Sequence, residues 1–499
     1  MEKMIDGAVI IICLFGITII AFWARKGQLG REDYFFGGRQ VPWWMVGFSL
    51  ATYSTSALEI AAIPGWVFFK DLKLVVGLAL SPILVIVFSK LWIPVWDRLR
   101  TFTVFKYLGL RFNEKLRVTV SLISLIGLII VMAAPIYITA LFIQSLFGLG
   151  IEFAIILITG IVCLYSFYGE AKADIWTDNL QLIIFLIGII LALFYCSSEV
   201  GGIKKAWDVA SVTASPQTGG AATTLFSLKF SLSEEATIWA FLFSYIFSGV
   251  IYGTNQTVVQ RVQCAFNPLN QKRALWLMTF INLVIVAALG ILGIFFVAYN
   301  VKQPGVFMDT TYDQVFLSYI FQEFPVGLRG LMAAAFLSAT MSTVDSNLNS
   351  ASNIIVSDFV EPRLRKKNEF QMLRISRWMV LAMSVFISGF AILLSLSPEY
   401  SIIQKLGGVL SILAGPITAV FVSGLLIRRV STFAAIAGII LGIVAFLIIV
   451  TVFKESINWM WFYSIGFIIP FCCIVAISFF FPRSVEKRNL FTWSSIKHM

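Results

Sequence analysis

Charged residues and histidine are scarce in this sequence. Of its 499 residues, 13% are Asp, Glu, Lys or Arg and 59% are hydrophobic. Soluble domains carry about a quarter charged residues, so this composition excludes an ordinary soluble domain. The single histidine is His498, which leaves no candidate for histidine-dependent catalysis or metal ligation inside an apolar segment. The composition therefore predicts a membrane protein without a histidine-based site.

Other absences narrow the class of function further. The six cysteines form no zinc-like spacing, and no GxxxxGK[ST] phosphate loop occurs, so a P-loop ATP-driven pump is excluded. The longest polar stretch, about residues 198–235, is too short for a catalytic domain. We therefore predict that the chain is not an enzyme and binds no organic cofactor.

Apolar runs long enough to cross a bilayer, about 20 residues each, recur along the chain. They are continuously apolar rather than alternating, which predicts helices and not a barrel. Thirteen runs lie near residues 7–24, 41–68, 73–96, 118–147, 150–168, 175–197, 236–260, 274–299, 326–356, 374–396, 403–427, 431–453 and 458–481. We predict an all-α membrane protein with about 13 transmembrane helices.

The basic residues set the predicted orientation in the cell membrane. An amino terminus outside and a cytoplasmic carboxyl terminus place most of the 37 Lys and Arg on the cytoplasmic side. The net charge of +11 then indicates contact between inner loops and anionic lipid of the bilayer, and nucleic acid is the weaker explanation.

Two runs contain small and hydroxyl residues of the kind that interrupt a helix at mid-membrane. The second run holds Ala-Thr-Tyr-Ser-Thr-Ser-Ala at 51–57, and the seventh holds Gly-Thr-Asn-Gln at 253–256. Either segment alone is also compatible with ordinary helix packing. They lie five runs apart, as two inverted repeats of five helices require. The predicted organisation is a leading helix (1–30), a first repeat (40–200), an extracellular loop (201–235), a second repeat (236–430), two trailing helices (431–482) and a cytoplasmic tail (483–499).

In the ninth run, Ala339, Ser342, Thr343 and Ser346 share one helix face by the three-and-four spacing. A loosened carbonyl at 339 with these hydroxyls offers hard ligands for a small cation such as sodium.

Among the carboxylates in the runs, we single out Glu59, Asp178 and Asp345. Each costs roughly 2.5 to 3.5 kcal/mol at mid-bilayer, which makes each a functional candidate. An interfacial position is the alternative for Asp178, because it follows Lys172 and Asp174.

Together these segments resemble the sodium/solute symporter family, which includes bacterial galactose and sialic-acid symporters. The resemblance rests on residues 33–38 (Asp-Tyr-Phe-Phe-Gly-Gly), 175–178 (Ile-Trp-Thr-Asp), 253–256 with 259–261 (Val-Gln-Arg), and 342–343 (Ser-Thr). It spans most of the chain and implies the LeuT-type inverted-repeat fold and sodium-coupled transport by alternating access.

The resemblance also implies ligands. A first sodium would be bound by the carbonyls of Thr52, Thr55 and Ala339 and the hydroxyls of Ser342 and Thr343. A second cation, sodium or a proton on Asp345, would involve Asp178, Ser342, Asp345 and Ser346. Substrate would contact Ser54, Ser56, Glu59, Tyr252, Asn255 and Gln404.

The substrate class is a further expectation. Residues 118–147 contain no arginine to pair with a substrate carboxylate, and Glu59 would accept hydrogen bonds from a polyol or pair with an amine. We predict uptake of a small polar solute, in the first place a neutral sugar or sugar derivative. An amino acid or amine as solute, a proton as coupling ion, and a channel without coupling are the alternatives.

Overall fold

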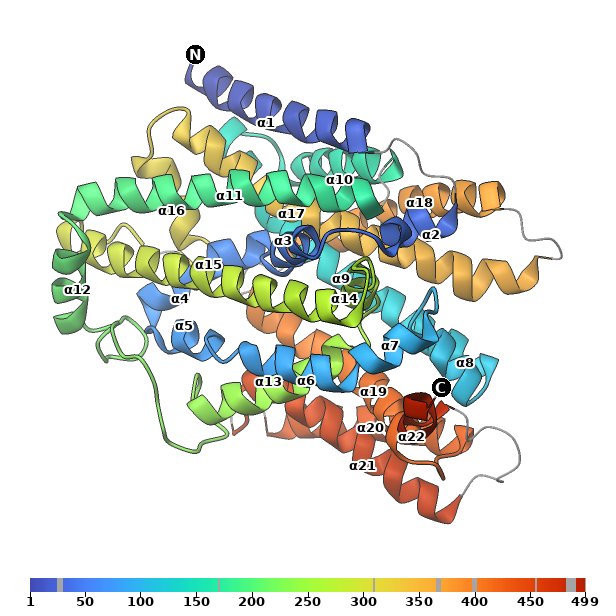
Figure 1. Cartoon of the computed structure of the whole chain (residues 1–499). Helices are drawn as coiled ribbons and strands as arrows, with labels where there is room; N and C mark the ends of the chain where they lie inside the picture. Colours follow the sequence, from blue (N-terminus) through green and yellow to red (C-terminus); the bar gives the residue numbers. More distant parts are fainter. Residues whose placement is uncertain are drawn as a thin grey trace.

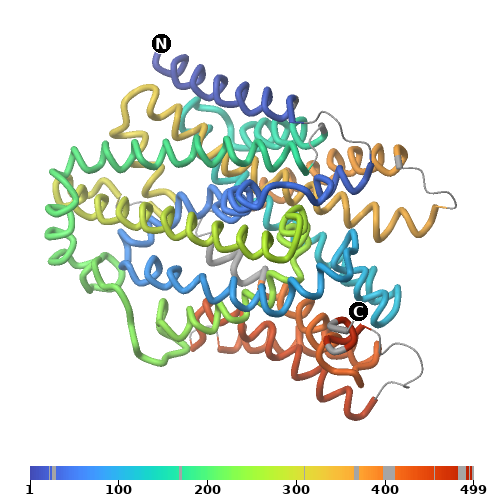
Figure 2. The backbone as a smooth tube through the Cα atoms, viewed as in Figure 1, coloured from blue at the N-terminus to red at the C-terminus, as the bar shows by residue number. Residues whose placement is uncertain are grey.

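The computed structural model describes residues 1–24, 30–168, 171–307, 310–364, 369–396, 402–453, 456–481 and 491–498. In these residues the regular elements are helices, and strand-type pairing is limited to two isolated bridges. The long helices run alongside one another, with the leading helix at one edge and the trailing helices at the opposite edge (Figure 1, Figure 2).

All thirteen predicted runs are helical. Ten are single helices: α1 (Glu2–Ala24), α9 (Glu114–Phe147), α10 (Ile151–Tyr168), α11 (Ala171–Val200), α15 (Pro268–Lys302), α17 (Leu328–Ile354), α18 (Glu369–Ser395), α19 (Ile402–Leu426), α20 (Thr432–Val452) and α21 (Phe462–Phe480). By length and hydropathy alone, eight described helices could cross a membrane, or ten if each bent pair is one span. The all-α membrane fold class is confirmed.

The second and seventh runs are interrupted where the sequence predicts. The second run consists of α3 (Trp43–Ser54) and α4 (Ala57–Phe69), which meet at 60°. The seventh consists of α13 (Ile238–Tyr252) and α14 (Gln256–Val262), which meet at 72°.

Each interruption restarts with a capped helix. At α4, Ser56 and Glu59 form a capping box, in which the backbone N–H of Ser56 donates to Glu59 Oε2 at 3.1 Å. At α14, Asn255 Oδ1 accepts from the backbone N–H groups of Thr257 and Val258. The caps satisfy amides that lipid could not, which explains how a helix end is stable at this depth.

The structure departs from the simplest expectation in the third run and the outer loop. The third run divides into α5 (Lys73–Leu78), α6 (Pro82–Leu91) and α7 (Ile93–Leu99), because Pro82 and Pro94 each stand in the first turn of a new helix. The predicted loop at 201–235 contains α12 (Ile203–Val212), an amphipathic helix that buries Ala206 and Ala210.

Shorter helices complete the chain outside the predicted runs. They are α2 (Arg31–Phe36), α8 (Lys106–Arg111), α16 (Val315–Glu323), α22 (Trp493–His498), the π-helical turn η2 (Ile355–Val360), and the 3-10 turns η1 (Gly37–Arg39), η3 (Glu361–Arg363) and η4 (Trp459–Trp461).

Helix α17 lies at the centre and positions the candidate site. It packs against α1, α3, α9, α11 and α18, and every residue from Met332 to Ile354 is buried. Its many Ser, Thr, Asn and Asp side chains therefore bond within the protein, as intramembrane polar groups must.

Candidate functional site

The end of α3 lies against α17, at the residues predicted to bind the first sodium. The Thr343 hydroxyl donates to the carbonyl of Ala339 at 3.1 Å and lies 3.4 Å from the carbonyl of Tyr53. The Thr52 carbonyl is turned toward the break, where it accepts from the Thr55 N–H at 3.3 Å. The two stretches thus meet, and their sodium-binding role stays a prediction.

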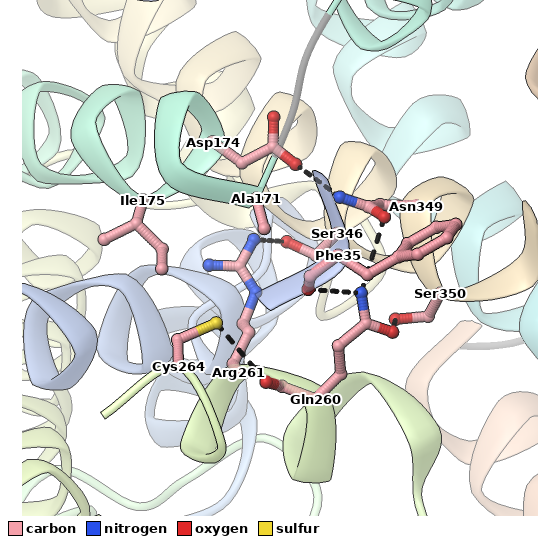
Figure 3. Close-up of a pocket in the computed structure, with 10 residues that line it drawn as sticks. All are labelled: Phe35, Ala171, Asp174, Ile175, Gln260, Arg261, Cys264, Ser346, Asn349 and Ser350. Atoms are coloured by element: carbon pink, nitrogen blue, oxygen red, sulfur yellow. Dashed lines mark hydrogen bonds between the residues drawn. The ribbon is translucent and has the colours of Figure 1, made fainter. Parts of the chain in front are cut away.

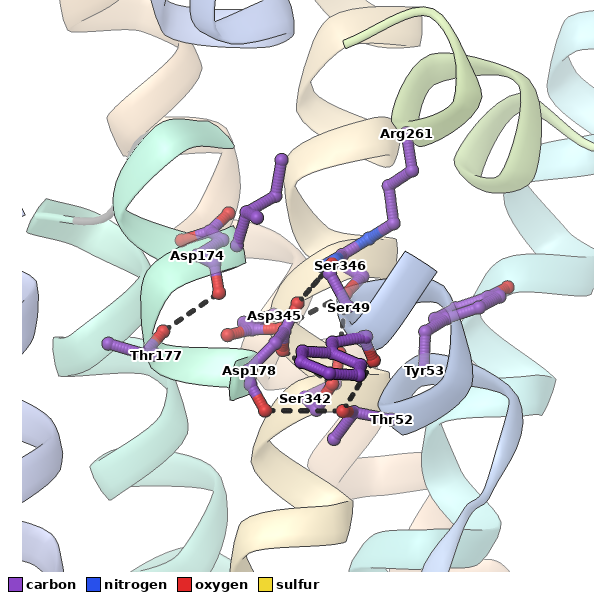
Figure 4. A network of polar contacts seen from close by, with 12 residues as sticks. Ser49, Thr52, Tyr53, Asp174, Thr177, Asp178, Arg261, Ser342, Asp345 and Ser346 are labelled. Atoms are coloured by element: carbon purple, nitrogen blue, oxygen red, sulfur yellow. Dashed lines mark hydrogen bonds and ion pairs between the residues drawn. The ribbon is translucent and has the colours of Figure 1, made fainter. Parts of the chain in front are cut away.

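The residues predicted for a second cation also lie together (Figure 4). The Ser342 hydroxyl donates to Asp178 Oδ1 at 2.5 Å, and the Ser346 hydroxyl lies 3.2 Å from Asp345 Oδ1. All four side chains are buried. Asp178 comes from α11 and the other three come from α17, so the pairing depends on the contact between these helices.

Arg261 is a member of this cluster that sequence reasoning did not assign. It projects from α14, forms an ion pair with Asp178, and donates to the hydroxyls of Ser49 and Ser346. Its side chain is buried. The sequence did carry a signal, because an arginine in an apolar run is rare and energetically costly. The prediction used Arg261 only as part of a family motif.

A cavity of about 400 Å³ adjoins the first sodium position. Four of the predicted substrate residues line it: Ser54, Ser56, Glu59 and Tyr252. Thr343 also lines it, so the cavity reaches the predicted sodium ligands. Small-molecule sites have volumes of roughly 300 to 1,000 Å³, and this cavity falls in that range.

The remaining two predicted substrate residues are placed differently. Asn255 lines a neighbouring cavity of about 90 Å³, and its side-chain oxygen caps α14. Gln404 lies on α19, but its side chain is outside the part of the chain that the structure describes.

Aromatic rings form much of the cavity wall, and apart from Tyr252 they were not predicted. The main ones are Tyr53, Tyr245, Trp459 and Tyr463. Asn282 of α15 was also missed; its amide donates to the Ser54 hydroxyl at 2.7 Å, beside the helix break. Aromatic residues make up 15% of this chain, so their presence in a run carries little signal about which ones face a cavity.

A buried polar cluster around Asp358 follows the carboxyl-terminal end of α17. The Asp358 carboxylate on η2 accepts from the hydroxyls of Thr103 at 3.0 Å and Ser121 at 2.9 Å, and lies 3.7 Å from Arg117. Burial raises the pKa of Asp358 to about 6, although these bonds and Arg117 act in the other direction. This contact ties α9 and the segment before α8 to the end of α17.

Comparison with known proteins identifies the family. The model of the sodium:solute symporter family matches residues 34–442. The sodium/sialic acid symporter SiaT of Proteus mirabilis is 26% identical over 474 residues, which cover 93% of this chain and 92% of that protein. The human sodium/iodide cotransporter is 28% identical over 451 residues, covering 88% of this chain and 68% of that protein. A sodium-coupled monocarboxylate transporter 2 of Danio rerio is 27% identical over 462 residues, covering 87% and 70%.

Solved structures show the same fold. A substrate-bound, outward-open Na⁺-coupled sialic acid symporter superposes with a TM-score of 0.84 at 24% identity, covering 96% of this chain and 99% of that one. Mhp1, a nucleobase-cation-symport-1 transporter in a closed conformation, gives 0.58 at 13% identity, covering 91% and 97%. The predicted LeuT-type inverted-repeat architecture is confirmed. This chain belongs to the sodium:solute symporter family and is a multi-pass membrane transporter that couples solute movement to sodium.

Proposed function

We propose that this chain imports a neutral polar solute, a sugar or sugar derivative, by alternating access driven by sodium bound at the junction of α3 and α17. The observation that carries the proposal is the approach of the Thr343 hydroxyl to the Tyr53 carbonyl, 3.4 Å away, on the wall of the substrate-sized cavity. An ion bound there would touch both repeats and the cavity, which is the geometry that coupling needs.

The proposed ligands of this ion are the carbonyls of Thr52, Thr55 and Ala339 and the hydroxyls of Ser342 and Thr343. Carbonyl and hydroxyl oxygens suit a hard alkali cation. The interruption after Ser54 frees carbonyls from helical hydrogen bonding, which supplies acceptors that an intact helix would not offer.

The cavity chemistry supports a neutral solute. The described residues that line it include one carboxylate, Glu59, several hydroxyls and six aromatic rings, and no Lys or Arg. Sialic acid, iodide and monocarboxylates, named for the relatives, are anions, and an anion here would face Glu59 without a basic partner. A sugar instead offers hydroxyls to Glu59 and the serines, and apolar ring faces to the aromatics.

An organic cation is the second candidate, because Glu59 and Tyr245, Tyr252 and Trp459 could pair with and enclose an ammonium group. For the second cation, the proposed site is Asp178, Ser342, Asp345 and Ser346, and its proposed occupant is sodium or a proton on Asp345.

The proposed orientation places the amino terminus outside and the carboxyl terminus in the cytoplasm. The cavity then extends toward the outer end, where Trp459 and Met460 line it, and the Asp358 contacts lie at the inner end. These features support an outward-facing state.

The predicted boundaries of the two repeats, 40–200 and 236–430, are also part of this proposal.

The experiment is uptake into proteoliposomes with an inward sodium gradient, repeated with choline replacing sodium at constant pH. Labelled neutral sugars, amines and sialic acid are tested in parallel. Sodium-dependent uptake of a neutral sugar supports the proposal. Uptake of sialic acid alone would contradict the substrate assignment, and uptake unchanged in choline would contradict sodium coupling.

A further inference from the structure

The amino-terminal end of α17 is capped by a side chain from another helix. Gly327, the residue before α17, has no side chain with which to cap it. Asp6 of α1 supplies the cap instead, because its Oδ1 accepts from the backbone N–H groups of Gly327 at 2.7 Å and Gly330 at 2.9 Å. A carboxylate at this end of a helix is also favoured by the helix dipole. The first turn of α17 therefore depends on α1 for its hydrogen bonds.

The two helices also approach each other closely at this point. A Cβ at Gly330 would lie 2.6 Å from the backbone oxygen of Asp6, so only a glycine permits this approach. Asp6 is 1% exposed, and its other carboxylate oxygen, Oδ2, lies 3.6 Å from Arg329 Nε. Both packing and charge therefore resist movement of α1 relative to α17.

The other half of α17 is held by a second set of polar contacts. Asn349 donates to Asp174 of α11 at 3.0 Å, and Gln260 of α14 donates to Asn349 Oδ1 at 3.4 Å (Figure 3). The residues of α17 that we propose to bind sodium, 339–343, lie between these contacts and the Asp6 cap. Their position along the helix axis is thus fixed from both sides.

The cap lies close enough to the proposed sodium ligands to affect their placement. Gly330 is nine residues before Ala339, which corresponds to about 13 Å along the helix at a rise of about 1.5 Å per residue. A rigid helix transmits a shift of its first turn over this distance. The Thr343 hydroxyl lies 3.4 Å from the Tyr53 carbonyl, and the ligands of an ion must be placed within about 0.2 Å. A small displacement of α17 against α3 would therefore weaken sodium binding.

We propose that Asp6 is a positioning residue for sodium binding. By capping α17 it holds residues 339–343 at the distance from α3 that the ion requires, so the leading helix α1 sets the sodium affinity of the transporter. The inference rests on the proposed sodium site. Asp6 acts through the backbone of α17 and is not among the residues that line the 400 Å³ cavity.

The test separates sodium affinity from overall stability in the purified full-length protein, with sodium as the only ligand. Melting temperature is measured against sodium concentration at constant ionic strength, with choline as the balancing ion. Asp6→Ala removes the cap and should raise the sodium concentration for half-maximal stabilisation about fivefold. A cap that serves only the stability of the fold would lower the melting temperature in choline and leave this concentration unchanged.

Two further variants complete the comparison. Asp6→Asn keeps an oxygen that can accept from the two N–H groups, so it should raise the half-maximal sodium concentration only about twofold. It remains informative if Asp6→Ala folds poorly. Glu2→Gln is the matched control on the same helix: it removes the 3.0 Å ion pair between the exposed Glu2 and Arg329 but leaves the cap, and should keep the wild-type value.

The outcomes distinguish this inference from the proposed function. If Asp6→Ala binds sodium with the wild-type half-maximal concentration, or if Asp6→Asn and Glu2→Gln give the same value, Asp6 does not position the sodium ligands and the sodium site still stands. A wild type that sodium does not stabilise overturns the sodium site, and this inference with it.

Discussion

At the scale of single residues, Glu59 has two tasks that can be separated by experiment. Its carboxylate caps α4 through the Ser56 N–H and also lines the substrate cavity. Because an amide oxygen can still accept the capping bond, Glu59→Gln should change substrate binding more than folding.

For a neutral sugar, Glu59→Gln should raise KM a few-fold, since one charge-assisted hydrogen bond becomes a neutral one worth about 1 kcal/mol less. For an organic cation, the loss of the counter-charge should raise KM by about 30-fold or more. Substrate titrations of sodium-driven uptake distinguish the two, and a KM that does not move would remove Glu59 from the substrate site.

The two hydroxyls proposed to bind sodium should not be equivalent. Ser342 also bonds to Asp178, whereas Thr343 bonds to two backbone carbonyls. Ser342→Ala should therefore raise the sodium concentration for half-maximal uptake by about 10-fold or more, and Thr343→Ala by less, because a net hydrogen bond to a charged group contributes about 1.5 to 3 kcal/mol. Equal sodium dependence in wild type and Ser342→Ala would refute this ligand assignment.

The sequence located these hydroxyls because polar residues at helical spacing stand out in an apolar run. It did not predict the partner of Asp178, because Arg261 is 83 positions away and only the packing of α14 against α3 and α17 brings the two together. For the same reason it could not select Tyr245 or Trp459 from the many aromatic residues.

At the scale of helices, the breaks in α3/α4 and α13/α14 were predictable from their small and capping residues. The angles of 60° and 72° were not, because they depend on what packs into each bend. At the second bend this is a tryptophan pair: Trp92 covers Gly253, and Trp96 Nε1 donates to the Gly253 carbonyl at 2.8 Å.

Gly253→Ala should therefore disturb the bend. A Cβ at this position would lie 1.8 Å from Trp92 Cδ1, so the indole or the helix must shift, at a cost of about 1 to 3 kcal/mol. We expect a melting temperature lower by several degrees and reduced sodium-driven uptake. Gly160→Ala in α10 is the control, because a Cβ there meets nothing within 4 Å. If both variants behave like wild type, the bend does not depend on this contact.

At the scale of the whole molecule, the thermal stability of the protein should depend on pH through Asp358, beyond the end of α17. Burial raises the pKa of Asp358 to about 6, so the folded chain holds this proton more tightly than the unfolded chain. Binding of this proton therefore stabilises the folded state. The contribution is fully present below the ordinary carboxyl pKa and is lost as the pH rises through about 6.

The wild type should therefore lose a few degrees of melting temperature between about pH 4.5 and pH 7, beyond any loss in Asp358→Asn, which cannot ionise. Melting curves of both proteins across this range provide the check. If the melting temperatures of the two proteins change in parallel with pH, ionisation of Asp358 does not affect the stability of the fold.

The number, type and order of the membrane helices followed from the sequence, because lipid demands continuous apolar helices. The division of the third run at its prolines and the helix in the outer loop did not follow, since both are set by local packing. The convergence of α3 and α17 depends on the whole fold, and sodium binding there is the central claim.

That claim is tested most directly by the melting temperature of the purified protein in sodium against choline. The wild type should be stabilised by sodium, and so should Thr340→Ala, whose hydroxyl on α17 faces Thr139 at 2.6 Å instead of α3. The double variant of Ser342→Ala and Thr343→Ala should show little or no sodium response. A double variant that sodium stabilises as strongly as the wild type would contradict the account.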